Sequence, residues 1–473
     1  MSIELFFTPN QSLAQLNFLF SVVMALVSGL FFYESLREQE SRALKFGLAG
    51  MVIHVCLALF NLYIESMSPF ITLYYLTLII FALILLIPCK DSISALKGTA
   101  GYIVGDVSKF DERDTVFSRN DDLSPGSEQY KQYYEMHPEC EERDALRRRK
   151  GSNLGKLCSI DNSPPAIVNM VTGCQYNIQS LLTSTRPAVP ERAEPLLLDP
   201  LNSTERIKKY ATHLGAELVG VCKIDKRWMY SHQGRCRGFK DIEWGDEIKS
   251  DYSYALVIVT EMDHDIMGTA PHSPVVMETM KNYSKGAFIT TAIANWFTQS
   301  GYRAVANHAG YYESLMVPLG IDAGIGQYSR MGYLISDKFG PRMRLAAVLT
   351  DMPLVPDKPV DLGVEEFCLS CKKCAESCPS RSIPLDGKRV KNGTRRWIID
   401  NGSCHDYWAR VGTDCGVCMS TCPFSRPNRS FHLLVKWLLK HSWISRKILP
   451  HLDNIVYGRR WKARRSPKWV SYK

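Results

Sequence analysis

The residues best suited to chemistry in this 473-residue sequence are cysteines crowded toward its C-terminal end. Eight of the fifteen cysteines lie between residues 368 and 422. A disulfide framework is typical of short secreted chains, whereas this chain is long and shows no cleavable signal peptide. So many cysteines within one short stretch of a large protein therefore indicate metal ligands.

The spacing of these cysteines is typical of iron–sulfur proteins. Residues 368–379 form a complete CxxCxxCxxxCP run, in which three thiolates bind one cubane and the fourth reaches a second cubane. A second run over 415–423 has Gly412 at its expected first ligand position, so Cys404 is the nearest substitute. Zinc sites favour paired CxxC motifs instead. The sequence thus predicts two [4Fe-4S] clusters with crossed ligands: Cys368, Cys371, Cys374 and Cys422 on one, and Cys378, Cys404, Cys415 and Cys418 on the other.

Three apolar runs at the N-terminus predict a membrane anchor over residues 1–89. Leu13–Tyr33, Phe46–Ile64 and Pro69–Pro88 contain no Asp, Glu, Lys or Arg. Each is close to the ~20 residues that a helix needs to cross a bilayer. A single run of this kind could be a buried core helix, but three in succession favour transmembrane helices.

Loop charges predict how the anchor is oriented. The link between the first two runs holds Arg37, Arg42 and Lys45, and the link between the second and third holds no Lys or Arg. The positive-inside rule then places this multi-pass anchor in the inner membrane, with everything after it in the cytoplasm. The last 43 residues carry eleven Lys or Arg and one Asp within a net charge of +9 for the chain. Such a tail suits an anionic leaflet, and a solvated polar tail explains it equally well.

Two polar residues interrupt the second apolar run. A second histidine that would complete a haem site is absent from the runs, so we exclude haem. A polar residue in a membrane helix can mark a quinone site, but it more often forms a hydrogen bond to a neighbouring helix. The quinone hypothesis therefore stays open as the weaker alternative for His54 and Asn61.

The chain between the anchor and the cysteines predicts an α/β fold. Helical spacing covers residues 203–214 and 282–299, and runs rich in β-branched residues predict strands at 216–224, 254–262 and 345–350. Residues 90–200 are polar and rich in turns, but their aromatic clusters indicate that they pack on the rest of the protein. Four glycines in the loop 320–332 could allow close approach of a ligand, although the loop lacks the strand and helix of a dinucleotide-binding fingerprint.

From about residue 109 onward the chain resembles the reductive dehalogenases, corrinoid and iron–sulfur enzymes that remove halide from organohalides. The resemblance implies an α+β fold: a nitroreductase-like domain at 201–362 with a base-off corrinoid, a ferredoxin-like domain at 363–430 with both clusters, and a basic tail at 431–473. It rests on the cysteine block and on these segments: KFDERDTVFSR (109–119), SEQYKQYYEMHPE (127–139), EMDHDIMGTAP (261–271), SGYRAVANHAGYYESLMVPLGIDAGIG (300–326) and KFGPRMRLAAVLTDMPLVPDKPVDLGVEEFC (338–368).

The same resemblance implies the site residues. Tyr283 matches the tyrosine that donates the proton, and Arg342 matches the cation beside it, since a cation stabilises a phenolate. Asn307 matches a polar residue that lines the pocket. The DxHxxG motif is absent, so the cobalt is expected to lack a protein histidine ligand. The corrinoid contacts are expected in the glycine loop, at Gly324, Gly326 and Gly332.

The implied reaction is a two-electron reductive dehalogenation of an organohalide, fed by ferredoxin, flavodoxin or quinol. Exported members carry a twin-arginine leader and a separate membrane protein, whereas this chain has three apolar runs of its own and resembles a self-anchored form. Membrane lipid is an expected partner and nucleic acid is not. Two alternatives stay open: an epoxyqueuosine-reductase-like enzyme of the same architecture, and a non-enzymatic membrane ferredoxin that lacks cobalt. The sequence does not determine the substrate, the electron donor or the oligomeric state.

Overall fold

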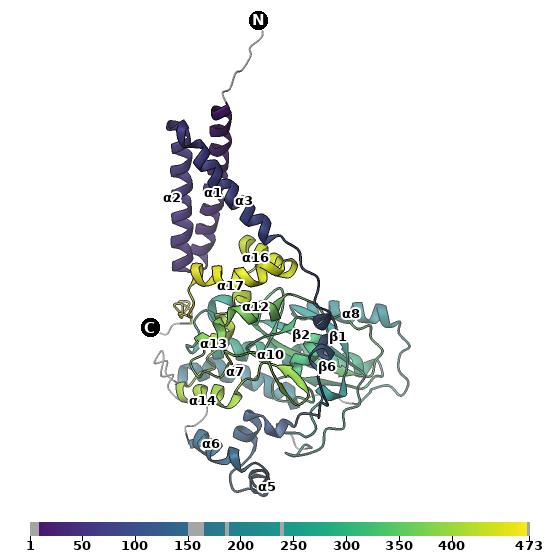
Figure 1. Cartoon of the computed structure of the whole chain (residues 1–473). Coiled ribbons are helices and arrows are strands. Elements are labelled where there is room, and N and C mark those ends of the chain that lie inside the picture. Colours follow the sequence, from purple (N-terminus) through teal and green to yellow (C-terminus); the bar gives the residue numbers. More distant parts are fainter. Residues whose placement is uncertain (1–8, 150–164, 185–188, 237–240, 471–473) are drawn as a thin grey trace. The chain divides into compact units, whose positions relative to one another are not determined.

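The computed structural model describes residues 9–149, 165–184, 189–236 and 241–470. Contacts divide the chain into two compact units, which are described separately. The first, here called the helical unit, comprises residues 1–90 and 428–459, and the second, the α/β unit, comprises residues 91–427 and 460–473. Figure 1 labels their elements along the chain.

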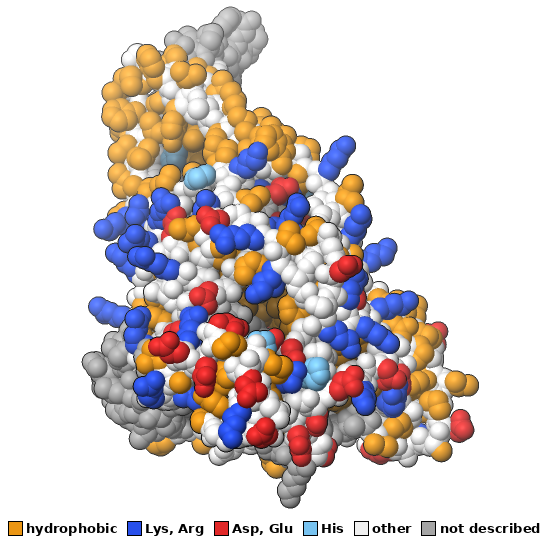
Figure 2. Space-filling model, turned by 60° about the horizontal axis from the view of Figure 1, so that its bottom comes forward, with side chains coloured by type: hydrophobic (Ala, Val, Ile, Leu, Met, Phe, Trp, Pro, Cys, Tyr) orange, Lys and Arg blue, Asp and Glu red, His pale blue; other side chains and the backbone are white. Residues whose placement is uncertain are grey.

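The helical unit contains three helices that are long and apolar enough to cross a membrane: Gln11–Arg37 within α1 (Pro9–Arg37), α2 (Ser41–Tyr63) and α3 (Ser68–Leu85). Figure 2 shows their surface as an area of apolar side chains. This confirms the three apolar helices that the sequence predicts.

Polar groups inside this bundle are bonded to neighbouring helices. Nδ1 of His54 lies 3.3 Å from the Tyr75 hydroxyl, which is also 2.7 Å from the Ser21 hydroxyl. Oδ1 of Asn61 accepts from the Ser68 hydroxyl, at the start of α3, at 3.4 Å, while its Nδ2 donates within α2 to the Leu57 carbonyl at 2.8 Å. Such contacts join membrane helices to each other, and they agree with the commoner of the two explanations for His54 and Asn61.

Two further helices complete the helical unit. They are α16 (Ser430–His441) and α17 (Trp443–Tyr457), drawn in yellow in Figure 1. Residues 430–457 are thus largely helical, although the sequence suggested only a basic tail from residue 431 onward. A short 3-10 turn, Glu65–Met67, links α2 and α3.

A four-stranded sheet forms the centre of the α/β unit. Its order is β1-β2-β6-β3 and every neighbouring pair is antiparallel, with Leu256 of β2 opposite Val348 of β6. The three predicted strands are all in this sheet, and of its four strands only the shortest, β3, was not predicted. The strands are β1 (Leu218–Lys223), β2 (Tyr254–Glu261), β3 (Ala304–Asn307) and β6 (Met343–Thr350).

Helices cover both faces of this sheet. α8 (Pro200–His213) and α10 (Pro274–Gln299) pack on one face, where Ile207 and Phe297 meet alternate strand residues such as Ile258. Alternation arises because successive side chains of a strand point to opposite faces. α11 (Met316–Asp322) contacts β1, β2 and β6 on the other face. There Gly220 leaves room for the Ala323 carbonyl, which a Cβ at that position would approach to 2.2 Å.

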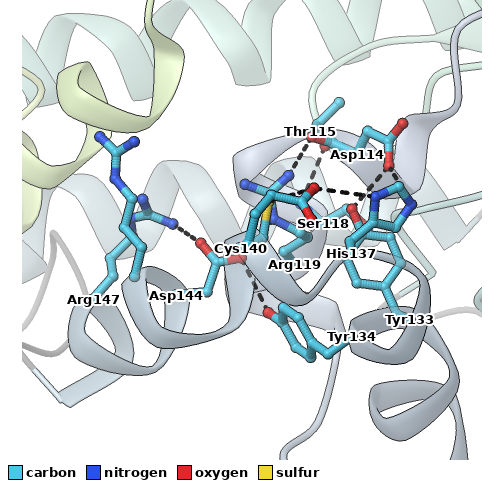
Figure 3. A network of polar contacts seen from close by, with 12 residues as sticks. Asp114, Thr115, Ser118, Arg119, Tyr133, Tyr134, His137, Cys140, Asp144 and Arg147 are labelled. Carbon is cyan, nitrogen blue, oxygen red and sulfur yellow. Dashed lines mark hydrogen bonds and ion pairs between the residues drawn. The ribbon is translucent and has the colours of Figure 1, made fainter.

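Residues 91–149 and 165–184 are largely helical. Tyr133 and Tyr134 are buried with Leu123 and contact Trp244. Figure 3 shows the polar network around them, in which Asp144 faces two arginines. The helices are α4 (Ile93–Leu96), η2 (Gly98–Tyr102), η3 (Glu112–Asp114), the π-helical turn η4 (Ser118–Asp122), α5 (Glu128–Met136), α6 (Pro138–Arg149) and α7 (Pro165–Ser184).

The remaining short elements surround the cysteine-rich segment or connect the sheet. They are η5 (Lys226–Trp228), α9 (His264–Met267), β4 (Gln327–Tyr328) paired with β5 (Leu334–Ile335), β7 (Arg389–Lys391) paired with β8 (Thr394–Arg396), α12 (Val364–Cys371), α13 (Lys373–Ser377), α14 (Asn401–Val411), α15 (Val417–Ser420) and η6 (Pro423–Ser425).

Candidate functional site

Short helices separated by sharp turns position the eight cysteines of the C-terminal block. Lys372, between α12 and α13, has φ of 52°, and Cys415, just before α15, has φ of 64°. These left-handed residues are uncommon outside glycine and reverse the chain within one residue. Several turns of this kind allow cysteines from four short helices to face common centres.

One group of cysteines surrounds Cys374. This thiol is buried, and its pKa is raised well above its usual value by burial and then by repulsion from Cys368, Cys371 and Cys422. All four side chains are buried. Four neighbouring thiols can ionise together only where a metal centre neutralises their charge. The group contains the same residues as the first crossed set, and their role as ligands stays a prediction.

The other four cysteines line a cavity of about 160 Å³: Cys378, Cys404, Cys415 and Cys418. Burial, followed by repulsion from Cys378, raises the pKa of the Cys404 thiol to about 12. Burial likewise raises the pKa of Cys415 to about 12, with Cys404 and Cys378 among its neighbours. These are the residues of the second crossed set.

The two groups suit a cluster better than a single ion. Among the residues that the structure describes, no three His, Cys, Asp or Glu side chains meet closely enough to hold one metal ion. A zinc site holds its thiolates at about 2.3 Å from one atom, whereas a cubane spreads its four thiolates over four irons. Cysteines arranged around a cavity therefore fit a [4Fe-4S] cluster.

Arg330 ties the glycine loop to the cysteine segment. Its guanidinium is buried and donates to the carbonyls of Cys368 at 3.0 Å, Pro384 at 2.8 Å and Asp386 at 2.7 Å. It also lies 5.1 Å from the ring of Trp397. One arginine thus binds three backbone carbonyls from two parts of the cysteine segment. Sequence reasoning missed this residue, and its only signal was a cation inside a loop of apolar and small residues.

The glycines of the loop 320–332 differ in what they face. A Cβ at Gly324 would lie 2.4 Å from the Lys358 carbonyl oxygen, and one at Gly326 would lie 2.1 Å from that of Ile335. Both positions therefore need glycine for packing within the protein itself. Gly332 lines the cavity with the cysteines. Of the three glycines expected to approach a cofactor, only Gly332 borders that cavity.

Tyr283 lies on α10, half-buried, beneath an arginine. The guanidinium carbon of Arg344 is 5.1 Å from the centre of the Tyr283 ring, and Nη2 of Arg344 donates to the Thr279 hydroxyl at 2.9 Å. Arg344 also lines the cavity that contains Cys418. A cation above a phenol ring is attracted to the electron-rich face of the ring.

The arginine expected beside Tyr283 lies elsewhere. Arg342 donates through Nε to the Ser425 carbonyl at 2.6 Å, and through Nη1 to Glu261 at 3.1 Å and to the Met262 carbonyl. These contacts occupy Arg342 just before β6 begins. The structure thus brings Tyr283 together with Arg344 and not with Arg342. Sequence reasoning could not separate two arginines that stand two residues apart in one segment.

Asn307 is fully buried at the end of β3. Its Oδ1 accepts from the Glu313 amide at 2.7 Å, but its Nδ2 has no hydrogen-bond partner among the described residues. The same holds for Nε2 of the buried His308 and for Nε of Arg344. Buried polar atoms normally have hydrogen-bond partners. Three such atoms near the ends of β3 and β6 fit a site at which a polar group of a bound cofactor or substrate supplies the missing bonds.

Comparisons with known proteins agree with this geometry. Residues 367–425 match the family described as 4Fe-4S dicluster domain. The tetrachloroethene reductive dehalogenase of Sulfurospirillum multivorans is 34% identical over 311 residues, which cover 59% of this chain and 62% of that protein. The tetrachloroethene reductive dehalogenase of Dehalobacter restrictus is 34% identical over 267 residues, or 47% of this chain and 48% of that protein. The chain thus spans about half to three fifths of the length of these relatives.

A solved structure shows that the fold is shared. The catabolic reductive dehalogenase NpRdhA, solved in complex with 3-bromo-4-hydroxybenzoic acid, aligns with a TM-score of 0.60 at 23% identity. The alignment covers 79% of this chain and 50% of the other. The chain is therefore similar in sequence and in fold to reductive dehalogenases, and its cysteine-rich segment matches a 4Fe-4S dicluster domain.

Proposed function

We propose that this chain is a membrane-anchored reductive dehalogenase that carries out R–X + 2e⁻ + H⁺ → R–H + X⁻. The position of Arg344 is the observation that carries this proposal. Arg344 lines the cavity with four cysteines and lies 5.1 Å from the ring of Tyr283. The proposed electron-transfer centre and the proposed proton donor therefore both lie next to Arg344. A reaction that consumes electrons and a proton needs these two groups close together.

The electrons enter through two [4Fe-4S] clusters held by the crossed sets of cysteines described above. The support for two clusters is the separation of the eight cysteines into one group around Cys374 and one around the cavity. We keep residues 363–430 as a ferredoxin-like domain and residues 201–362 as a nitroreductase-like domain. Cys404 replaces the ligand that is missing at Gly412.

A base-off corrinoid completes the proposed site, and when bound it supplies the low-valent metal that cleaves the carbon–halogen bond. The residue best suited to hold it is Asn307, whose buried Nδ2 has no partner among the described residues. Gly332 borders the cavity assigned to the second cluster and would contact the corrinoid only where the two cofactors adjoin. Gly324 and Gly326 contribute by letting the loop pack closely against residues 335 and 358.

The proton comes from the Tyr283 hydroxyl in this proposal. Arg344 holds a positive charge above the ring and stabilises the phenolate that remains after proton transfer. We assign this role to Arg344, since Arg342 is bound to Glu261 and to two carbonyls. Asn307 lines the pocket.

Tyr283→Phe tests the proton donor. We expect the rate of dehalogenation to fall by roughly 10²–10⁴-fold, which is the usual contribution of a positioned acid. Arg344→Met should slow the reaction as well, whereas Arg342→Lys, which keeps a charge toward Glu261, should change it less. A Tyr283→Phe protein with full activity and intact clusters would remove Tyr283 from the mechanism.

Metal analysis tests the enzyme as a whole. Anaerobically purified full-length protein should contain iron and about one cobalt per chain, and should release halide from halogenated phenols or ethenes. Iron without cobalt would indicate a membrane ferredoxin. Reduction of epoxyqueuosine in tRNA without halide release would indicate the epoxyqueuosine-reductase-like alternative.

The proposed location is the inner membrane, with the α/β unit in the cytoplasm. The support is the basic residues at the adjoining ends of α1 and α2, where Arg37 ends α1 and Arg42 lies in the first turn of α2. There the enzyme would receive electrons from ferredoxin, flavodoxin or quinol. Protease added to intact spheroplasts should leave the α/β unit uncut, and cleavage from outside would refute this orientation.

A further inference from the structure

α16 exposes large apolar side chains that a helix on a water-soluble protein normally buries. Leu433, Leu434 and Trp437 are 51%, 53% and 50% exposed, whereas His432 and Lys436 are buried. The three apolar residues stand at i, i+1 and i+4, so they share one face. A helix in water normally turns such a face toward the core and its charged residues outward. α16 does bury Leu438 and Leu439, but it leaves these three large apolar side chains exposed and buries two polar residues beside them.

The inward polar residues are bonded, so this orientation is fixed. Nε2 of His432 lies 3.0 Å from Oε2 of Glu38, and Nζ of Lys436 donates to Oδ1 of Asn428 at 2.9 Å. These contacts satisfy polar groups that would be costly to bury alone. Rotating the helix about its axis to bury Leu433 and Leu434 would break both contacts. The apolar face therefore points away from the protein for a structural reason.

The helices α16 and α17, here called the α16–α17 hairpin (residues 430–457), attach to one end of the membrane-spanning helices. Arg42, next to the start of α2, donates to the Ile455 carbonyl at 2.8 Å. The Ser445 hydroxyl donates to the carbonyl of Leu85, the last residue of α3, at 2.9 Å. A membrane crossed by these helices must have its surface near their ends. The hairpin therefore lies at the depth of that surface.

α17 continues the exposed face with the residue types typical of a lipid headgroup layer. Trp443, Lys447, His451 and Ile455 are exposed and follow one another at intervals of four residues. The Lys447 ammonium lies 4.9 Å from the centre of the Trp443 ring. Tryptophan is enriched where membranes meet water, and lysines there contact anionic lipid.

We propose that the α16–α17 hairpin lies in the plane of the membrane, with Leu433, Leu434 and Trp437 among the lipid acyl chains. Lys440 and Lys447 would then contact anionic headgroups. Lipid is the occupant that fits best, because this face belongs to the same unit as the spanning helices and carries exposed cations beside its apolar residues. The inference is independent of the enzymatic proposal.

Tryptophan fluorescence offers a direct test, because none of the nine tryptophans lies in residues 1–90. The full chain is placed as single copies in nanodiscs made with lipids that are brominated or unbrominated in their acyl chains. Single copies ensure that a second chain does not cover the face. We expect bromination to quench part of the emission, and Trp437→Phe/Trp443→Phe to lose at least half of that quenching. Trp469→Phe, which removes an indole that is 71% exposed outside the hairpin, is the matched control and should lose less than half as much.

A second pair of variants tests the headgroup contact. Lys440→Glu/Lys447→Glu should reduce quenching at least twofold in discs that contain phosphatidylglycerol, and should change it less in discs of phosphatidylcholine alone. A wild-type chain that bromination does not quench, or a Trp437→Phe/Trp443→Phe variant quenched as strongly as the wild type, would overturn the proposal.

Discussion

Replacing Asp144 by asparagine should loosen α5 and α6 while the central sheet stays protected. Asp144 on α6 is 1% exposed and accepts hydrogen bonds from Nε of Arg119 at 2.6 Å, from Nη1 of Arg147 and from the Tyr134 hydroxyl at 3.1 Å. Figure 3 shows this carboxylate at the centre of the network. Asparagine keeps the shape of the side chain and removes its charge.

The size of the effect follows from how deeply the two arginines are buried. The Arg119 and Arg147 side chains are almost fully covered, so each would lose its buried counter-charge. Removing one partner of a buried ion pair costs roughly 3–5 kcal/mol. Arg147 keeps a second partner, because its Nε donates to Oδ1 of Asp406 at 2.7 Å. We therefore expect the lower end, about 3 kcal/mol, which is on the order of 100-fold in the equilibrium for local opening.

Hydrogen exchange with mass spectrometry at pH 7 measures this opening region by region. Peptides from residues 128–149 should exchange on the order of 100-fold faster in Asp144→Asn, and peptides from β2 should be unchanged. Asp406→Asn is the matched control, since Asp406 is half-buried on α14 and pairs with Arg143 and Arg147 near the surface. In Asp406→Asn we expect the exchange of residues 128–149 to be less than tenfold faster than in the wild type. A change below threefold in Asp144→Asn, or an equal change in β2, would refute the reasoning.

Three further predictions concern protons and iron. Burial opposes the ionisation of Asp144, but Arg119 keeps its pKa below the usual value, so its stabilisation is lost as the pH falls below about 4. Exchange in α5 and α6 should then accelerate in the wild type and not in Asp144→Asn. Burial lowers the pKa of His308 to about 4. As the pH drops from about 6.5 to about 4, the unfolded chain therefore binds a proton at this histidine before the folded chain does, and the free energy of unfolding should fall. Thermal unfolding should show a flatter pH dependence for His308→Asn. Cys404→Ala should lose about half of the iron found by chemical analysis, because one of two clusters loses a ligand, whereas Cys140→Ala should lose none.

Local spacing was enough to predict much of this protein. Thiolate spacing depends on a few turns of chain, so the two groups of cysteines could be written down before the fold was known. Apolar runs of membrane length and strands rich in β-branched residues are also local signals, and β1, β2 and β6 lie where the sequence puts them. The short strand β3 was missed because its four residues carry too little pattern.

Close to the proposed site, the sequence offered candidates and the packing selected among them. Arg342 and Arg344 are the same residue type in one short segment, so the sequence does not distinguish their roles. In the structure, Arg342 binds the carbonyls of Ser425 and Met262, whereas Arg344 lies above the ring of Tyr283. Gly324 and Gly332 look alike in one loop, yet Gly324 is required by the Lys358 carbonyl and Gly332 borders a cavity. Which partner a side chain meets is a long-range property that no local pattern contains.

The C-terminal helices show most clearly what the sequence determines and what only the folded structure determines. The sequence determines that α16 is amphipathic, because this follows from the spacing of its residues. It does not determine which side of the helix turns toward the protein. Glu38, nearly four hundred residues earlier in the chain, binds His432 and holds that side chain inward. The outward direction of Leu433 and Trp437 is thus set by a contact that exists only once the chain has folded.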